Sequence, residues 1–292
     1  MRQSYYLIMT CADYWQTFCG EPFFNMAFDE WMAWRASQCP GAVLLRLYTW
    51  RTGAITIGLH QREELAVAGE RLVGTPVIRR VTGGRAVYHE PSELTYAIAV
   101  NLHGLDNRIL VGSTSATSAG IASALIHFLS SLGIESRSAH GLPRHVGSAR
   151  SFHTLPCFAS ASRFEVVSGS DKVVASAQRR IGAAYLQHGA IKLSGIAPHP
   201  ALRGASYRSL CAESVAPLTT EVFEQAANLF RSRVTEYLEL TTEDRQLAGV
   251  DRETVCSRAR FIQENPMSVR DFFQHWTSKN SLLQEPEREK TA

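Results

Sequence analysis

The stretch "RRVTGGRAVYHE", residues 79–90, sets two adjacent glycines among three arginines and leads into a short β-like run. Paired glycines after a strand usually mark a turn or a bulge. Three arginines, however, are too many charges to bury without partners, so an anion or a polar headgroup is expected near the loop. Because Gly83 and Gly84 lack a Cβ, a ligand can lie directly against the backbone. The segment therefore predicts a turn that also binds a ligand.

This loop differs from the two common glycine motifs that bind phosphate. The GKS/T that completes a Walker loop does not follow the glycines, and the dinucleotide-binding pattern GxGxxG is absent. Backbone N–H groups beside paired glycines can still bind a phosphate or a carbonyl oxygen. The loop is thus expected to bind a polar group without being a nucleotide motif.

Outward from this loop, strand-like and helix-like segments follow one another irregularly. Runs of β-branched and aromatic residues predict strands, and apolar residues at i, i+3 and i+4 predict amphipathic helices. The expected strands are 42–50, 54–60, 76–84, 86–90, 93–100, 157–169 and 171–193, and the expected helices are 22–38, 63–72, 121–133 and 219–240. A Ser/Thr-rich segment, 112–120, is placed to cap the third helix. Elements without a regular βαβ order indicate the α+β class.

Length and composition exclude several broad classes. The 292 residues fit one large domain or two small ones, and 45% hydrophobic with 20% charged residues is typical of a globular protein. A net charge of +3 is too weak to indicate nucleic-acid binding, but it is compatible with an acidic protein partner. No stretch approaches the roughly 20 apolar residues of a membrane span, and a secretory signal pattern is absent from the first residues. A cytoplasmic location is expected.

The six cysteines include no CxxC pair, which argues against that kind of zinc site. Most are expected to be reduced packing residues. Cys157 stands at a loop-to-strand boundary, and Lys172 follows after a tight turn expected at 168–171. Spacing alone does not decide whether the two touch. A nearby ammonium would favour the thiolate, which can accept an acyl group and pass it on; a purely structural cysteine is the alternative.

Two histidines have a possible role in a site. His89 is followed by Glu90, which suggests a tethered imidazole, whereas His188 in "LQHGAI" reads by default as a satisfied strand histidine. The sequence shows neither the nucleophile elbow of a Ser-His-Asp enzyme nor the HExxH helix of a zinc protease.

Six segments occur in the order found in the biotin/lipoate protein ligase superfamily. They are "NMAFDE" (25–30), "IGLHQ" (57–61), "RRVTGGRAVYHEPSELTY" (79–96), "CF" (157–158), "KVVASAQRR" (172–180) and "LQHGAI" (186–191). Within this superfamily the chain most closely resembles the octanoyltransferases of the LipM type, over roughly residues 20–240. The resemblance implies an α+β, biotin/lipoate protein ligase-like catalytic domain with mixed, mostly antiparallel sheets packed with helices.

Three features favour this branch over the ATP-using lipoate ligases. The loop reads "TGGR", with Arg85 in the place where the ligases usually carry a third glycine, and "ELTY" also resembles the octanoyltransferases. Cys157 falls where this branch has its acyl-accepting cysteine, with Lys172 fifteen residues later. The ligases activate the acid as an adenylate and need no cysteine there.

The resemblance also implies roles for named residues. Cys157 would be the nucleophile that forms an acyl thioester, and Lys172 would favour its thiolate and help to orient the thioester carbonyl. The substrate-binding residues implied are Arg79, Arg80, Arg85 and His89 around the loop, Gly83 and Gly84 lining the acyl tunnel, and Gln178, His188 and Gly189 completing the pocket wall. In a competing arrangement, Lys172 alone positions the acyl group and Cys157 is structural.

The sequence departs from the family pattern at two places. Ala175 stands where the family tends to have glycine, which adds a methyl near the expected ligand and bears on chain-length preference. The turn "SGSDK" is also one residue longer than expected between its glycine and the lysine. The implied organisation is a catalytic domain at 20–241 and a polar extension at 242–292, partly helical with a frayed tail.

The implied activity is transfer of an octanoyl group in lipoate biosynthesis. The donor is octanoyl-acyl carrier protein, and the acceptor is a lysine of a lipoyl domain, such as glycine cleavage H protein or a 2-oxoacid dehydrogenase E2. Thioester to amide is downhill, so no cofactor, neither ATP nor a metal, is expected. The rival functions are an ATP-dependent lipoate–protein ligase, an amidotransferase between lipoyl domains and, more distantly, a non-enzymatic lipoyl-binding scaffold.

Overall fold

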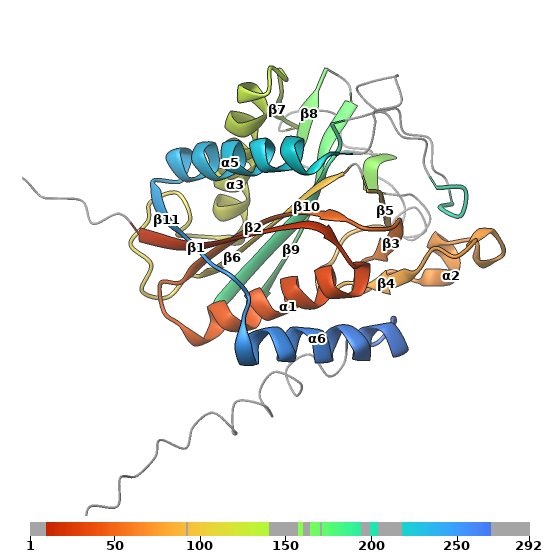
Figure 1. The fold of residues 1–292 in the computed structure, drawn as a ribbon. Helices are drawn as coiled ribbons and strands as arrows, with labels where there is room; N and C mark the ends of the chain where they lie inside the picture. Colours follow the sequence, from red (N-terminus) through yellow and green to blue (C-terminus); the bar gives the residue numbers. More distant parts are fainter. Residues whose placement is uncertain are drawn as a thin grey trace, which may run out of the picture.

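The computed structural model describes residues 10–91, 93–139, 157–159, 164–169, 171–193, 199–203 and 218–269. An eight-stranded sheet forms the centre, in the order β11-β1-β2-β6-β10-β9-β8-β7 (Figure 1). Its strands are β1 (Thr10–Gly20), β2 (Val43–Trp50), β6 (Leu94–Asn101), β7 (Arg137–Ser138), β8 (Val166–Ser168), β9 (Asp171–Ile181), β10 (Ala184–Ile191) and β11 (Leu240–Asp244). A second sheet has the order β4-β3-β5, from β3 (Ala54–Ile57), β4 (Val77–Arg79) and β5 (Val87–His89).

Both sheets mix parallel and antiparallel pairs. In the large sheet β1 runs parallel to β2 and β11, and all the other neighbours are antiparallel. In the small sheet β3 is parallel to β4 and antiparallel to β5. The predicted α+β class, with mixed and mostly antiparallel sheets packed with helices, is confirmed.

Within the described residues, four long helices cover the two faces of the large sheet (Figure 1). α1 (Pro22–Gln38) and α6 (Gly249–Glu264) pack together on one face, and α3 (Thr114–Ser131) and α5 (Thr220–Tyr237) pack together on the other. α1 begins with a proline, whose missing N–H costs nothing in the first turn. The side chains of Ser113 and Thr219 cap α3 and α5 by accepting from backbone N–H groups. The short elements are α2 (Glu63–Ala66) and the 3-10 turns η1 (Gly69–Arg71) and η2 (Cys157–Ala159).

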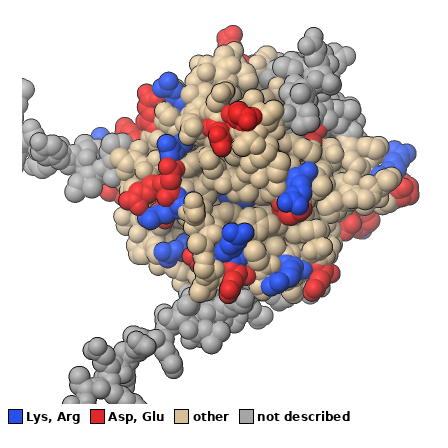
Figure 2. All heavy atoms as spheres, in the orientation of Figure 1, with Lys and Arg blue, Asp and Glu red and all other residues tan. Residues whose placement is uncertain are grey.

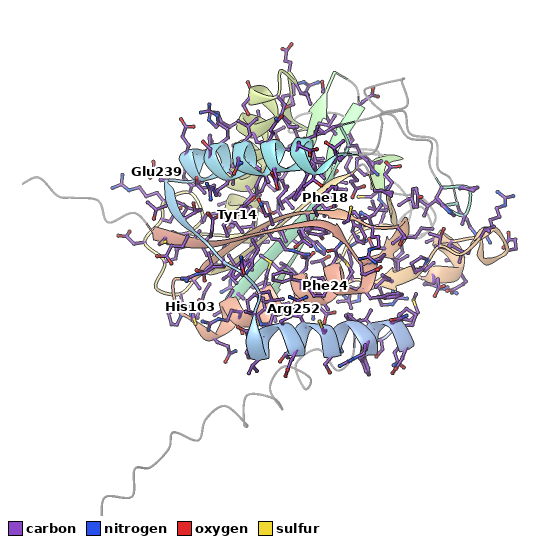
Figure 3. The ribbon with its side chains drawn as sticks, viewed as in Figure 1. Tyr14, Phe18, Phe24, His103, Glu239 and Arg252 are labelled. Atoms are coloured by element: carbon purple, nitrogen blue, oxygen red, sulfur yellow. The ribbon has the colours of Figure 1, made fainter. Side chains whose placement is uncertain are left out.

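The three central strands β2, β6 and β10 are buried along their whole length, so each contributes side chains to two cores. Alternate residues point to opposite faces of a sheet. In β2, for example, Leu45 and Leu47 join the core under α3 and α5, whereas Leu44 and Tyr48 join the core beside α1 and α6. Figure 3 shows Tyr14 and Phe18 of β1 on the side of α5, where the Phe18 ring lies 5.4 Å from that of Phe223.

Several elements differ from the sequence prediction. β1 was not predicted, and the helix expected at 63–72 is only α2 and η1, because Val67 leaves the helix to bridge to Leu202. The Ser/Thr-rich segment caps its helix through Ser113, as predicted, but α3 begins earlier than expected, at Thr114, and includes the rest of the segment. Cys157 lies in η2 and not at the start of a strand. The expected tail at 283–292 and most of the irregular segment before Cys157 lie outside the described residues.

Two described elements after residue 239, β11 and α6, contact the rest of the domain. The expected boundary between 241 and 242 falls inside β11, which pairs with β1. α6 is anchored to α1 by a buried ion pair, in which Arg258 Nε lies 2.7 Å from Glu30 Oε2. Figure 2 shows basic and acidic side chains intermixed on one face of the molecule. At the sheet edge, Arg245 forms ion pairs with Asp13 and Glu243. Exposed pairs of this kind add little stability.

Among the described residues, no helix is long and apolar enough to span a membrane.

Candidate functional site

A cavity lies where β5, β9, β10 and η2 come together next to α1. It holds about 340 Å³ of empty space, part of which is open to solvent. Its polar lining includes Arg80, His89, Cys157 and His188, and its small or apolar lining includes Val87, Ala175 and Ala190. A tight apolar cluster surrounds the cysteine, made of Val87, Cys157, Phe158, Ala175 and Ala190. The cavity therefore combines an apolar wall with a thiol and a cation.

Cys157 and Lys172 are in contact in this cavity wall. Lys172 Nζ lies 3.3 Å from Cys157 Sγ and donates a hydrogen bond of 2.7 Å to the Cys157 carbonyl oxygen. Both side chains are almost fully buried. A third buried group, Glu165, completes the arrangement, since its Oε1 is 2.5 Å from Lys172 Nζ and 3.9 Å from Cys157 Sγ. The thiol thus faces an ammonium that is already paired with a carboxylate.

The β8–β9 hairpin and the arginine loop position these three groups. Lys172 is on β9 opposite Val167 of β8, and Glu165 immediately precedes β8. The backbone N–H of Cys157 donates to the carbonyl oxygen of Ala86, at 2.8 Å. The nucleophile candidate is therefore tied to the loop that contains the paired glycines.

Arg80 organises this loop from inside. Its Nη2 donates to the carbonyl oxygens of Gly83 and Arg85, at 2.7 and 2.9 Å. Gly84 has φ +88, a backbone conformation that favours glycine, and a Cβ there would meet Arg80 Nη2 at 2.8 Å. Gly58 packs even more closely, because a Cβ on it would lie 1.9 Å from the Gly84 carbonyl oxygen. The glycines let the loop close around a guanidinium.

His89 belongs to a buried chain of hydrogen bonds that starts at Arg80. Arg80 Nη1 donates to Thr56 Oγ1, which is 2.8 Å from His89 Nε2, and His89 Nδ1 is 2.6 Å from Glu93 Oε1. Burial lowers the pKa of His89 below its ordinary value, although Glu93 opposes this. Burial alone would raise the pKa of Glu93, but Lys192 and His89 hold it below its ordinary value. His89 is therefore a neutral imidazole with a fixed orientation at neutral pH.

His188 is held by a second buried cluster on α1 and β2. Its Nδ1 lies 2.8 Å from Asp29 Oδ2, and its Nε2 lies 2.6 Å from Thr82 Oγ1. The same carboxylate accepts from Arg46 Nη1 at 3.0 Å and from the Tyr48 hydroxyl at 2.7 Å. Because a carboxylate only accepts, Nδ1 of His188 carries a proton that it donates to Asp29.

The predicted site residues fall into two groups. Arg80, His89, Cys157, His188 and Gly189 line the cavity, and Lys172 and Arg85 contact Cys157 directly; Arg85 Nη2 lies 3.4 Å from the Cys157 carbonyl oxygen.

The remaining four predicted residues, Arg79, Gly83, Gly84 and Gln178, do not line the cavity. Arg79 donates to the carbonyl oxygens of Gly58, Leu59 and Gln61 and so holds a neighbouring loop. Gln178 is an exposed residue of β9. Gly84 lies next to the buried guanidinium of Arg80, and the Gly83 carbonyl oxygen accepts from it, so both glycines help to close the loop. The acyl-tunnel role expected for them stays a prediction.

Sequence analysis missed Glu165, Asp29, Arg46, Glu93 and Lys192. Asp29 and Arg46 had a detectable signal, since each is a charged residue on an apolar segment: "NMAFDEW" in the helix and "VLLRLY" in the strand. A charge on a fully buried stripe calls for an opposite charge. Glu165 had no such signal, because its contact with Lys172 depends on how β8 pairs with β9, where Val167 lies opposite Lys172.

Comparison with known proteins gives both a family and relatives. The model of the family described as "Lipoyl protein ligase A/B catalytic domain" matches residues 21–278. A protein named "Octanoyltransferase LipM" from Moorella thermoacetica is 32% identical over 188 residues, which are 63% of this chain and 66% of that protein. A protein of the same name from Carboxydothermus hydrogenoformans is 38% identical over 169 residues, 57% of this chain and 59% of that protein. The chain thus matches less than two thirds of the length of these relatives.

A solved structure has the same fold. Protein Ta0514 from T. acidophilum, a putative lipoate protein ligase with bound lipoic acid, superposes with a TM-score of 0.65 at 19% identity, over 90% of this chain and 98% of that chain. At this identity the likeness shows the biotin/lipoate protein ligase-like fold.

Proposed function

Because the chain belongs to the lipoyl protein ligase A/B catalytic domain family, we propose that it transfers an octanoyl group to a lysine of a lipoyl domain through a thioester on Cys157. The contact between Cys157 Sγ and Lys172 Nζ, 3.3 Å apart in the wall of an apolar cavity, carries the proposal. The relatives named octanoyltransferase LipM support octanoyl as the acyl group. The proposed donor is octanoyl-acyl carrier protein, and the acceptor is a lipoyl domain of the H-protein or E2 type.

The reaction takes two steps at one sulfur. In the first, Cys157 Sγ loses its proton and attacks the donor thioester; an S–C bond forms at the enzyme, the C–S bond to the carrier breaks, and the departing carrier thiolate takes up that proton. In the second, the acceptor amine attacks the enzyme thioester, a C–N bond forms, the C–S bond breaks, and the amine's proton returns to the sulfur. Covalent catalysis of this kind lets two bulky protein partners use one site in turn and gives ping-pong kinetics.

The surroundings of Cys157 fit both ends of the acyl group. Lys172 Nζ also contacts the Cys157 carbonyl, so the ammonium is fixed beside the position at which a thioester carbonyl would form. The cluster of Val87, Phe158, Ala175 and Ala190 provides apolar surface for the tail. Burial at about 0.8 kcal/mol per CH₂ gives an eight-carbon chain on the order of 5 kcal/mol. Apolar contact alone can therefore hold an uncharged tail.

The intact mass of the protein after mixing with octanoyl-acyl carrier protein tests this function. We expect a gain of one octanoyl group that hydroxylamine removes, and no gain in Cys157→Ala. Cys39→Ala is a matched control, because Cys39 is a free cysteine at the end of α1, away from the cavity. An octanoyl group that persists on Cys157→Ala would contradict the proposed nucleophile.

Two rival activities within the family give different results in the same assay. An ATP-dependent lipoate–protein ligase would modify a lipoyl domain from free lipoate and ATP, with release of pyrophosphate and without any carrier. An amidotransferase would take octanoate from an octanoylated lipoyl domain and not from acyl carrier protein. A buried thiol beside an ammonium serves acyl transfer and not adenylate formation, which argues against the ligase. The same geometry serves the amidotransferase, so only the identity of the donor separates that rival. The cytoplasmic location expected from the sequence stays a prediction.

A further inference from the structure

Arg80 is a buried cation in the cavity, and its hydrogen bonds go only to neutral groups. The residue is 5% exposed. Among the described residues its guanidinium donates to the carbonyl oxygen and hydroxyl of Thr56 and to the carbonyl oxygens of Gly83 and Arg85. Its Nε has no hydrogen-bond partner in the described part of the chain. A buried cation held only by neutral acceptors is costly and leaves its charge available to an anion in the cavity.

Lys172, by contrast, has its charge balanced. Its Nζ lies 2.5 Å from Glu165 Oε1, and both side chains are buried. A buried ion pair presents little net charge to a third group. Contact with Lys172 therefore orients the Cys157 sulfur, while the paired carboxylate cancels most of the positive potential that an isolated ammonium would provide.

Two other basic groups near the cavity, Lys192 and His188, are paired with carboxylates. Lys192 Nζ lies 2.5 Å from Glu93 Oε2 and 2.9 Å from Glu90 Oε1, and Glu93 also binds the neutral His89. His188 faces the Asp29 carboxylate. These groups leave Arg80 as the cation lining the cavity that has no contacting carboxylate within the described residues.

The loop fixes Arg80 relative to Cys157. Two consecutive carbonyl groups connect them: that of Arg85 accepts from Arg80 Nη2, and that of Ala86 accepts from the Cys157 N–H. Both side chains line the same cavity. Burial lowers the pKa of Arg80 to about 10, and the charge of Cys157 opposes this, so Arg80 remains a cation at neutral pH.

We propose that Arg80 is the counter-ion of the Cys157 thiolate and of the oxyanion that forms when a thioester is attacked, whereas the Lys172–Glu165 pair positions the sulfur without supplying net charge. This deepens the proposed function, on which it rests. This role also explains the paired glycines, because they allow the carbonyl oxygens of the loop to bind the Arg80 guanidinium beside the cavity. Fixed charge aimed at a developing oxyanion is a large source of rate enhancement in acyl transfer.

The test compares alkylation of Cys157 by iodoacetate, which is anionic, with that by iodoacetamide, which is neutral, at pH 7 and low salt. The two rates are measured at Cys157 by peptide mass spectrometry, and their ratio reports local positive charge. In Arg80→Gln we expect the iodoacetate-to-iodoacetamide ratio to fall by roughly threefold to tenfold, because one nearby charge is lost. Arg80→Lys should recover most of the ratio. Arg179→Gln removes the same charge from a residue that holds the Val81 carbonyl outside the cavity, and should leave the ratio near wild type.

The double variant Lys172→Met with Glu165→Gln decides between the two cations. It removes a pair without net charge, so the ratio should stay within about twofold of wild type even though transfer slows. A fall as large as that of Arg80→Gln in the double variant, or an unchanged ratio in Arg80→Gln, would overturn the proposal. If Arg80→Gln does not fold, the alkylation ratios of the double variant and of Arg80→Lys still show which cation provides the positive charge near Cys157. Alkylation needs no acyl donor, so the two tests are independent. A failed octanoylation assay would refute the proposed function, but it would not change what the alkylation ratios show about Arg80.

Discussion

The two faces of the large sheet are both buried under helices, but they differ in the kind of polar side chain that they bury. Under α3 and α5, the buried polar groups of the central strands are uncharged, as in the chain from Ser118 through the Tyr185 hydroxyl to Gln187 and Tyr96. Beside α1 and α6, the same strands contribute Arg46 and His188, and the helix supplies carboxylates. Both faces are equally buried. In the described strands β2, β6 and β10, buried charged groups therefore lie on the face that continues into the cavity.

This difference indicates which face is built for stability and which for function. Neutral hydrogen-bonded groups are inexpensive to bury, whereas buried ion pairs often contribute no more stability than apolar residues of the same size. The ionic clusters on the cavity side fix the orientation of His89 and His188 and leave Arg80 available. Their value lies in the positions they impose on groups around Cys157.

Asp29→Ala should give the largest effect on stability. The carboxylate is a shared partner of Arg46, Tyr48 and His188, so its removal leaves a buried guanidinium without a charge partner. We expect the free energy of unfolding to fall by about 3–5 kcal/mol, measured by urea denaturation. Tyr185→Phe is the matched change on the other face, and it should cost about 1–2 kcal/mol.

Equal costs for these two variants would mean that the ionic face is no more sensitive than the neutral one. The comparison between the faces would then fail. Asp29→Asn, which keeps the size of the side chain, should lie between the two.

Gly189→Ala should have the next largest effect, because this residue lies between the two faces. Its backbone lines the cavity, but a Cβ would point to the other face, 2.5 Å from the Ala175 carbonyl oxygen and 2.8 Å from the Tyr96 ring. Overpacking of this kind costs typically about 1–3 kcal/mol. Thermal and urea unfolding measure it.

Gly83→Ala is the control for this substitution. A Cβ on Gly83 meets nothing within 4 Å, so we expect a change below about 0.5 kcal/mol. If both alanine variants were tolerated equally, the requirement for glycine at residue 189 would not come from packing against the apolar face.

The sequence predicts the sheets and helices well wherever the pattern is local. The α1 prediction of 22–38 matches Pro22–Gln38, and the helix expected at 219–240 is α5, Thr220–Tyr237. β1 was missed because its sequence, "TCADYWQTFCG", alternates poorly and its strand character comes from two parallel neighbours. Parallel pairing joins distant segments and leaves a weak local signal.

The site could be predicted only at the level of residue types. Motif order placed Cys157, Lys172 and the arginine loop together, and the structure brings them into one wall of the cavity. Spacing could not separate the adjacent residues Arg79 and Arg80, although one holds a loop and the other faces the cavity. That choice depends on the pairing of β3 with β4, in which Ile57 lies opposite Arg79. The pairing of strands that are distant in the sequence thus decides which of the two arginines faces the cavity, and the local sequence does not show this.

The smallest expected effect is a pH dependence of stability that belongs to the cavity side alone. Burial holds the pKa of His89 below its ordinary value of about 6.5, so as the pH falls the unfolded chain takes up a proton at this residue before the folded protein does. Stability should therefore be full above about pH 6.5 and decline below it. Burial also lowers the pKa of the partly buried His199, so this residue adds to the loss of stability as the pH falls. Burial raises the pKa of Glu90, so this carboxyl has the opposite effect on stability, at the lower pH values where a glutamate takes up its proton.

Urea unfolding between pH 7.5 and 5.5 measures this dependence. His89→Gln should flatten the decline, His60→Gln, which removes an exposed histidine, should leave it as in wild type, and Tyr185→Phe should lower stability equally at both pH values. The tyrosines of the α3 and α5 face stay neutral throughout this range, since burial raises the pKa of Tyr96 to about 12. A decline in His89→Gln as steep as in wild type would show that the imidazole takes up its proton equally readily in both states, and the cavity side would then be no more pH-sensitive than the neutral face.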